Sequence, residues 1–401
     1  IASGGNYNVA IGDEAGTAIT TGDNNSAVGY GSLAASTTAV DNVAIGKGAL
    51  AATGAGTDGS YNTAVGVDAL VANTEGQFNV AMGRRAGYAN TTGDYNNALG
   101  YLTLYANTTG SNNIAVGYQA LYANTTASNN TAVGNAALAA NTTGTQNVAV
   151  GALALDANTT GNNNIGIGYH SNSATTTGAN NVAVGAEALD ANTTADNNTA
   201  IGTFALGANT TGTYLTAVGT YALDANTTAN SNTAVGYNAL TGNTTGHSNT
   251  AVGVTALGNS TTSNANTAVG YLALLANTTG HSNTAVGSEA GDSITTGDEN
   301  VAIGHGALDA ATTANGNTAV GTDTMGGALT GDNNTAVGYN AMLVATSVTG
   351  TTAIGNQCLD AVTTGDNNTG VGSGALGANT TGAGGVAVGT SALDANTTGI
   401  R

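Results

Sequence analysis

Few residues in this 401-residue chain have side chains suited to catalysis or metal binding, and they are scattered. They include four histidines and one cysteine: His170, His247, His281, His305 and Cys358. His247 and His281 occupy equivalent positions in Gly-His-Ser-Asn, two sequence repeats apart. Stacked repeats would hold them ~10 Å apart, too far to share one zinc ion, and no further ligand completes a site. We therefore expect no metal, no cofactor and no enzymatic activity.

Acidic residues are more regular, but their pattern also predicts no site. Turn aspartates bind calcium in some solenoids through a nine-residue glycine-rich repeat, which is absent here. Solvated acidic edges that discourage lateral clumping are the favoured interpretation. Cys358 stands where alanine is usual, so we expect a packed, unreactive thiol. The recurrent aspartates are Asp23, Asp156, Asp190, Asp224, Asp309, Asp332, Asp360, Asp366 and Asp394.

Composition narrows the class of protein. The chain has 62 Gly, two Phe, no Pro or Trp and 7% charged residues, which does not suit a conventional mixed core. Its 41% hydrophobic residues also argue against disorder. A net charge of −19 disfavours nucleic acids and anionic membranes as partners. No apolar run approaches the ~20 residues of a membrane span, so we expect no membrane insertion.

An internal repeat organises the whole chain. If the Gly closing each Ala-Val-Gly or Ala-Ile-Gly is numbered zero, it recurs every 17 residues from Gly12 to Gly389 in 23 units. One step is longer, from Gly46 to Gly66, and its three extra residues lie within 53–60. We predict a single continuous solenoid over residues 1–401. Because the sequence begins and ends within a repeat, we also expect a fragment of a longer chain.

Each unit contains two short apolar runs, Asn-Thr-Ala-Val and Ala-Leu-x-Ala, separated by corners rich in Gly, Asn and Thr. Such runs predict strands and turns, and 17 residues are too few for a helical repeat. We therefore predict an all-β parallel β-solenoid (β-roll) with two short strands in each 17-residue coil.

The apolar columns predict the interior of the coil. Position −1 is aliphatic in every unit, and position +4 is Leu or Met in most. We expect these two columns to meet inside, with alanine at +6, such as Ala123 and Ala157, filling the rest. Position −2 is Ala or Gly, so both faces of the strand are apolar or small. A strand with two dry faces is typically buried on both sides, which predicts a partner chain.

The polar columns predict ladders and surface contacts. Asn stands at −4 and Thr at +9 in 20 of 23 units each. At a strand spacing of ~4.8 Å their side chains should hydrogen-bond along the stack. Twelve units carry Asn-Thr-Thr, which is formally a glycosylation sequon. The predicted ladders are Asn113, Asn130, Asn147 and Thr109, Thr126, Thr143. The tyrosines at +1 are either corner residues or surface contacts for glycans; they include Tyr101, Tyr118, Tyr237 and Tyr271.

The motif resembles known fibre repeats. Residues 232–246 resemble repeats of phage-type tail-fibre proteins and bacterial surface proteins, and the Asn-x-Ala-Val-Gly core at 181–185 is similar to the head repeat of trimeric autotransporter adhesins. The resemblance covers essentially the whole chain. It implies a left-handed parallel β-roll, a homotrimer about a fibre axis, and a role in attachment outside the cell or on a virion.

These observations favour a shaft or adhesin segment of an extracellular or virion fibre, which associates as a trimer or end to end. The first alternative is a self-polymerising cell-surface filament, glycosylated at its Asn-Thr-Thr corners. The second is an ice-binding solenoid. Such a face usually has outward threonines at i and i+2, whereas the paired threonines of this repeat are adjacent at a corner, so the sequence disfavours it.

Overall fold

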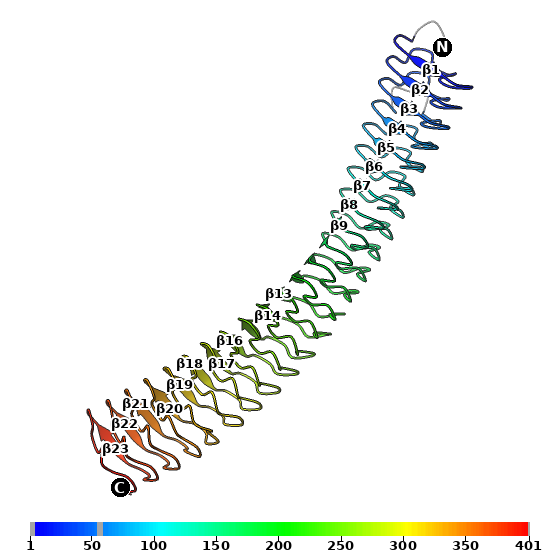
Figure 1. The fold of residues 1–401 in the computed structure, drawn as a ribbon. Coiled ribbons are helices and arrows are strands. Elements are labelled where there is room, and N and C mark those ends of the chain that lie inside the picture. Colours follow the sequence, from blue (N-terminus) through cyan, green and yellow to red (C-terminus); the bar gives the residue numbers. More distant parts are fainter. Residues whose placement is uncertain (1–4, 54–58, 400–401) are drawn as a thin grey trace. The chain divides into compact units, whose positions relative to one another are not determined.

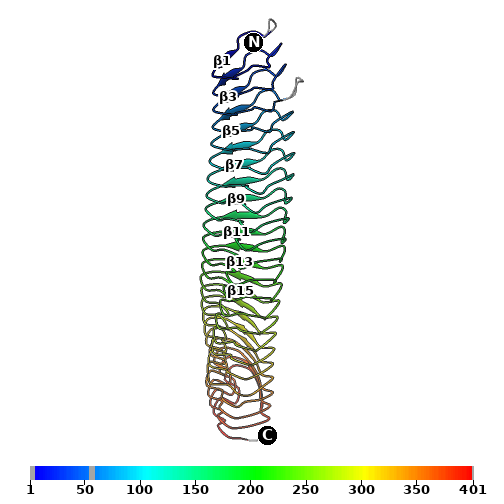
Figure 2. The same cartoon turned by 90° about the vertical axis from the view of Figure 1, so that its right-hand side faces the viewer.

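The structure, a computed structural model, describes residues 5–53 and 59–399. These residues form a parallel β-solenoid with one three-residue strand in each coil, and they contain no helix. The chain divides into two compact units, Ile1–Asn198 (unit 1) and Thr199–Arg401 (unit 2). Within each unit the strands stack along one side of the coils (Figures 1 and 2). The predicted β-solenoid is thereby confirmed.

The strands occupy the same three positions, −3 to −1, in every described coil. Unit 1 contains β1 (Val9–Ile11), β2 (Ser26–Val28), β3 (Val43–Ile45), β4 (Thr63–Val65), β5 (Val80–Met82), β6 (Asn97–Leu99), β7 (Ile114–Val116), β8 (Thr131–Val133), β9 (Val148–Val150), β10 (Ile165–Ile167) and β11 (Val182–Val184). Unit 2 contains β12 (Thr199–Ile201), β13 (Thr216–Val218), β14 (Thr233–Val235), β15 (Thr250–Val252), β16 (Thr267–Val269), β17 (Thr284–Val286), β18 (Val301–Ile303), β19 (Thr318–Val320), β20 (Thr335–Val337), β21 (Thr352–Ile354), β22 (Thr369–Val371) and β23 (Val386–Val388).

Strict register joins neighbouring strands within each unit. Thr216 pairs with Thr233, and the next two residues of β13 and β14 pair in the same way. The long repeat keeps this register, since Val43 of β3 pairs with Thr63 of β4. The three extra residues therefore leave the next strand in register. Residues 54–58 of the insertion lie outside the described residues.

The prediction of two strands per coil is wrong for the Ala-Leu-x-Ala run. Leu121 in this run has φ 52°, in the left-handed region, and the equivalent leucines repeat that conformation. A left-handed residue interrupts the extended backbone of a strand. The run still bonds to the next coil, because Leu121 N donates to Ala137 O at 3.0 Å and Ala123 N donates to Ala139 O at 2.9 Å.

The glycine at position zero makes the stacking possible. Gly236 has φ 136°. A Cβ atom there would lie 2.4 Å from the carbonyl oxygen of the equivalent Gly253. Only glycine tolerates both the backbone conformation and this close approach of the next coil.

The core lies on the opposite side of the strand from the one predicted. Ala115 at −2, Ala120 at +3 and Leu121 at +4 are fully buried. The aliphatic residue at −1 points outward instead, as does the residue at −3, because successive side chains of a strand alternate between faces. The thin interior admits a methyl group at −2 opposite the leucine. Alanines at +6, such as Ala123 and Ala157, are half-buried and line the edge of the core.

Candidate functional site

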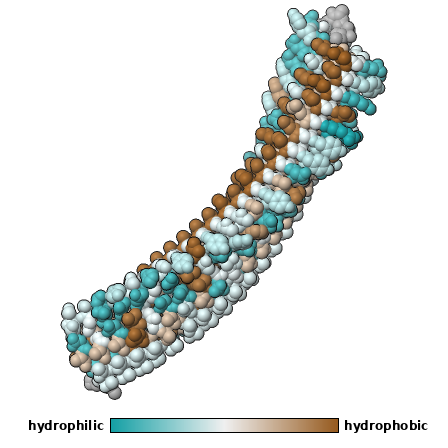
Figure 3. Space-filling view, viewed as in Figure 1, coloured by the Kyte–Doolittle hydropathy of each residue, from teal (hydrophilic) through white to brown (hydrophobic). Residues whose placement is uncertain are grey.

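The outward side chains at −3 and −1 of the strands form a surface that we call the outward face. Ile45, Met82 and Ile114 expose 41%, 46% and 40% of their surface there. Figure 3 shows apolar side chains gathered in a band over the strands of unit 1. None of the described strands contains an ionisable residue. The outward face is therefore an uncharged, repetitive surface that water contacts in the single chain.

The two units differ at position −3 of this face. In unit 1 the residue is Val or Ile in seven of eleven strands. In unit 2 it is Thr in ten of twelve strands, with Val301 and Val386 as the exceptions. Position −1 stays aliphatic in both units. Unit 1 thus presents a mainly hydrocarbon face, and unit 2 presents alternating hydroxyl-bearing and aliphatic files.

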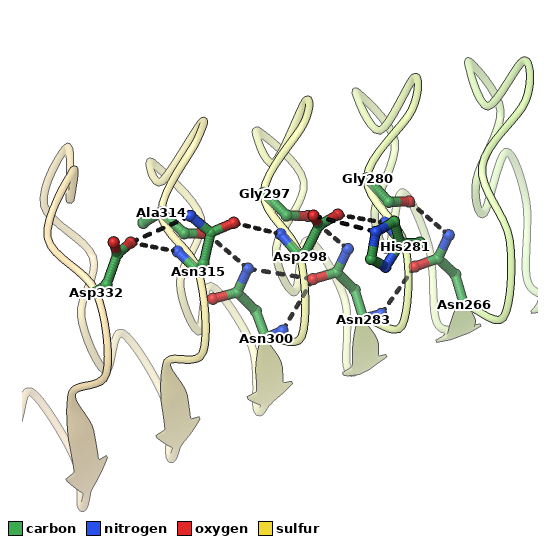
Figure 4. A network of polar contacts seen from close by, with 10 residues as sticks. All are labelled: Asn266, Gly280, His281, Asn283, Gly297, Asp298, Asn300, Ala314, Asn315 and Asp332. Carbon is green, nitrogen blue, oxygen red and sulfur yellow. Dashed lines mark hydrogen bonds and ion pairs between the residues drawn. The ribbon is translucent and has the colours of Figure 1, made fainter.

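The structure places Asn113, Asn130 and Asn147 in one file of buried amides, as predicted for position −4. Asn130 N donates to Asn113 Oδ1 at 3.0 Å, and Asn147 N donates to Asn130 Oδ1 at 2.9 Å. Each Nδ2 donates to a corner carbonyl of the following coil, as Asn130 does to Gly144 O at 2.9 Å. Figure 4 shows the same file in unit 2, running through Asn266, Asn283 and Asn300. This file fixes the register of successive coils.

A second amide file, at +7, was missed by the sequence reasoning. Asn124 Nδ2 donates to Asn107 Oδ1 and to Ala127 O, both at 3.0 Å. These are the asparagines of the Asn-Thr-Thr sequons. Up to Asn379 they are fully buried, so a glycan on their amides would displace the core. The burial of these asparagines argues against the alternative in which the Asn-Thr-Thr corners carry glycans.

The threonine ladder lies one residue earlier than predicted. Thr109, Thr126 and Thr143 at +9 are exposed at the corner. The hydroxyl that bonds between coils belongs to position +8, where Thr108 Oγ1 donates to Thr125 O at 3.1 Å. The sequence reasoning recognised the column but could not separate two adjacent threonines whose side chains leave the backbone in different directions.

The tyrosines predicted as surface contacts are exposed. Tyr101 and Tyr118 stack on each other with ring centroids 5.8 Å apart. Tyr237 and Tyr271 are also exposed, and Val254 occupies the equivalent position between them. Further stacks, which the sequence reasoning missed, join Tyr61–Phe78–Tyr95 and Tyr88–Tyr105–Tyr122 with centroids 4.9–5.2 Å apart. Stacked rings cover each other's faces, so unstacked tyrosines present more ring surface to a ligand.

Three of the four histidines lie on the surface beside a carboxylate, and the fourth, His247, lies beside Ser248 and Asn264. His281 Nε2 lies 3.2 Å from Asp298 Oδ2, as Figure 4 shows. His170 and His305 lie 4.0 and 3.8 Å from Asp190 and Asp323. Within residues 5–53 and 59–399, no three His, Cys, Asp or Glu side chains are placed to hold a metal ion.

Burial perturbs the remaining titratable groups of interest. Burial raises the pKa of the Cys358 thiol to about 11, which keeps it protonated and unreactive. Burial also raises the pKa of several aspartates at +5, which are half-buried and not fully solvated as predicted. These are Asp156, Asp224, Asp292, Asp309 and Asp360.

The described part of the chain has no helix long and apolar enough to cross a membrane. Neither a family model nor a curated protein matches the chain. The outward face and the corner tyrosines are thus the surfaces from which a function has to be inferred.

Proposed function

We propose that the chain is a structural segment of an extracellular or virion fibre, in which copies associate side by side through the outward face. The observation that carries this proposal is the uncharged hydrocarbon face of unit 1. Exposed apolar patches larger than a few hundred Å² typically mark interaction surfaces. A solenoid that contacts other copies through one face can serve as a fibre for attachment or spacing. We propose no catalytic role for it.

The size of the face supports a stable contact. At one strand spacing of ~4.8 Å per coil, the eleven strands of unit 1 extend the outward face over about 50 Å, a length suited to a continuous contact between two copies. This surface is dominated by β-branched side chains such as Ile114 and Ile165. Their burial would release water from apolar surface, which is the main driving force of association.

A second copy of this chain is the partner that fits best. Each copy repeats its outward side chains at one strand spacing, so two parallel copies match along their whole contact. The net charge of −19 repels like copies at long range, but no ionisable residue lies in the described strands, so the contact itself is uncharged. The resemblance to trimeric fibre repeats leads us to propose three copies in a left-handed roll. End-to-end pairing through an edge strand is the alternative contact.

Attachment would use the surfaces that association leaves open. The exposed Tyr101, Tyr118, Tyr237 and Tyr271 lie at the corner next to the strand and are the candidates for contacts with host or surface glycans. Aromatic rings suit such contacts because they combine apolar surface with a polar hydroxyl. The alternative of a glycosylated self-polymerising filament loses support, because the Asn-Thr-Thr amides are buried.

Sedimentation equilibrium of two matched double variants tests the association. Val116→Lys with Val150→Lys places two ammonium groups on the outward face of unit 1. Thr109→Lys with Thr143→Lys places the same charges at exposed corners of the neighbouring coils. We expect a trimer for the wild type and the corner variant, and a monomer for the outward variant. A monomeric wild type, or equal dissociation of both variants, would contradict the proposal.

A further inference from the structure

Unit 2 presents a second kind of outward face, which fibre association does not explain. Ten of its strands carry Thr at −3 and Val or Ile at −1, with a buried Ala or Gly between them. We call these outward pairs the Thr-x-Val array. Its strands are β12–β17 and β19–β22.

The array is a regular two-dimensional mesh. Register pairs Thr233 with Thr250 and Val235 with Val252, so like residues follow each other along the stack. Strands lie ~4.8 Å apart, and residues i and i+2 of one strand are ~6.6 Å apart. Hydroxyl and methyl groups therefore recur on a mesh of about 4.8 by 6.6 Å. The shorter of these two lengths is close to a repeat of the oxygen positions in hexagonal ice.

The hydroxyls of the array need a hydrogen-bonding partner from outside the chain. Among the described residues, the hydroxyls of Thr216, Thr233 and Thr250 bond to no other protein group, and these side chains are half-exposed. Burying a hydroxyl without a partner costs about 1–3 kcal/mol. A dry contact with another sheet would incur that cost at each Thr. Ordered water avoids this cost, because it hydrogen-bonds to the hydroxyls and packs against the methyl groups between them.

From these observations we propose that the Thr-x-Val array of unit 2 is an ice-binding surface. Its methyl groups hold water in an ordered arrangement, and its hydroxyls anchor that layer at lattice positions. The sequence disfavoured this activity because the conspicuous threonines at +8 and +9 are adjacent at a corner. The relevant threonines are those at −3. Their outward partner two residues later is aliphatic and not a second threonine, so each pair contributes one hydroxyl and one apolar group. Bulky charged side chains are absent from the mesh, so a flat crystal surface can approach it.

Thermal hysteresis of the full chain tests this inference. Thr250→Lys with Thr267→Lys puts two long charged side chains on adjacent rows of the array. Thr245→Lys with Thr262→Lys makes the same change at exposed corners of neighbouring coils. We expect the wild type and the corner variant to depress the freezing point below the melting point. The array variant should lose most of this gap while keeping its circular-dichroism spectrum.

Incorporation of fluorescently labelled chain into a growing ice hemisphere gives a second readout. Both measurements are repeated in the Val116→Lys, Val150→Lys background, so that association through unit 1 cannot hide the array. Hysteresis and uptake into ice that are lost only with the array variant support the inference. Exclusion from ice in both backgrounds, or equal loss with the corner variant, overturns it. Neither outcome depends on whether the chain forms a trimer.

Discussion

Two buried asparagines at the same position should respond oppositely to one substitution. Asn124 is fully buried in an intact stretch of the +7 amide file. Its Nδ2 donates to Asn107 Oδ1 and Ala127 O, and its Oδ1 accepts from Asn141 Nδ2 at 2.8 Å. The Asn124→Ala variant would remove all three hydrogen bonds. It would also leave Asn107 Oδ1 buried without its donor.

Asn277 occupies the equivalent position where the file is interrupted. Its neighbours in the adjacent coils are Ser260 and Ile294 instead of asparagine. The side chain is fully buried, and neither Nδ2 nor Oδ1 has a hydrogen-bond partner. The amide there bears the cost of desolvation without compensation.

The expected magnitudes follow from this difference. At roughly 1 kcal/mol per hydrogen bond, Asn124→Ala should cost about 3 kcal/mol, and more if Asn107 stays unpaired. Asn277→Ala loses no hydrogen bond and removes an unpaired buried amide. It should therefore change the free energy of unfolding by no more than about 1 kcal/mol, or increase it. Both variants remove the same atoms from the same kind of site, so the cavity contribution is matched.

Native-state hydrogen exchange suits the measurement, because stacked repeats can open locally without global unfolding. We expect backbone amides in the coils next to Asn124 to lose protection in Asn124→Ala. Those next to Asn277 should keep or gain protection in Asn277→Ala. Equal losses in the two variants would refute the reasoning, since they would mean that packing and not the amide ladder holds the coils in register.

Two further predictions concern charge and modification. Burial, followed by the nearby Asp292 and Asp323 carboxylates, raises the pKa of Asp309, so folding favours its protonated form. The free energy of unfolding should therefore fall as pH rises from the unfolded pKa of ~3.9 through the raised folded pKa. Asp309→Asn should accordingly raise the melting temperature at pH 7 but not at pH 3. If the exposed control Asp41→Asn raised the melting temperature equally, the effect would come from net charge instead. In a eukaryotic secretory host, glycopeptide mapping should find no glycans on the buried Asn124 or Asn141. It should find glycans on the exposed corner sequons of Asn129, Asn197, Asn333 and Asn367. Glycans on the buried asparagines would contradict the hydrogen-bonded amide file at +7.

The period predicted the stacking and register because both depend only on counting. Which face of the strand points into the core was harder to predict. Ala at −2 and Val at −1 are both apolar, and the larger residue was assigned to the core. A usable signal was present. Position −2 is confined to Ala and Gly, whereas −3 ranges over Thr, Val, Ile, Ser and Asn. A position restricted to the smallest residues fits a tight interior better than an open surface.

The left-handed leucine at +4 could not be predicted from residue type, because Gly, Asn and Asp are the usual residues in that region. Gly16 and Gly291 stand at +4 in two coils, where most coils have leucine. The structure explains them, since Ile19 and Ile294 stand at +7 of the same coils. The Cδ1 atoms of these isoleucines lie 3.0 and 2.9 Å from where a Cβ would stand on each glycine. The isoleucine thus fills the space of the missing leucine, and the amide file is interrupted in return.

The outward face itself argues for contacts that differ between the two units. Strand propensity alone would favour Thr, Val and Ile at −3 without distinguishing one unit from the other. Instead, seven of eleven strands in unit 1 carry an aliphatic residue there, and ten of twelve in unit 2 carry Thr. Folding does not require this difference at −3, because the strand residue that faces the interior, at −2, is Ala or Gly in both units. A hydrocarbon face gains from a dry protein contact, whereas a face of unpaired hydroxyls gains from ordered water. The segregation is therefore better explained by what each face binds than by what each strand needs to form.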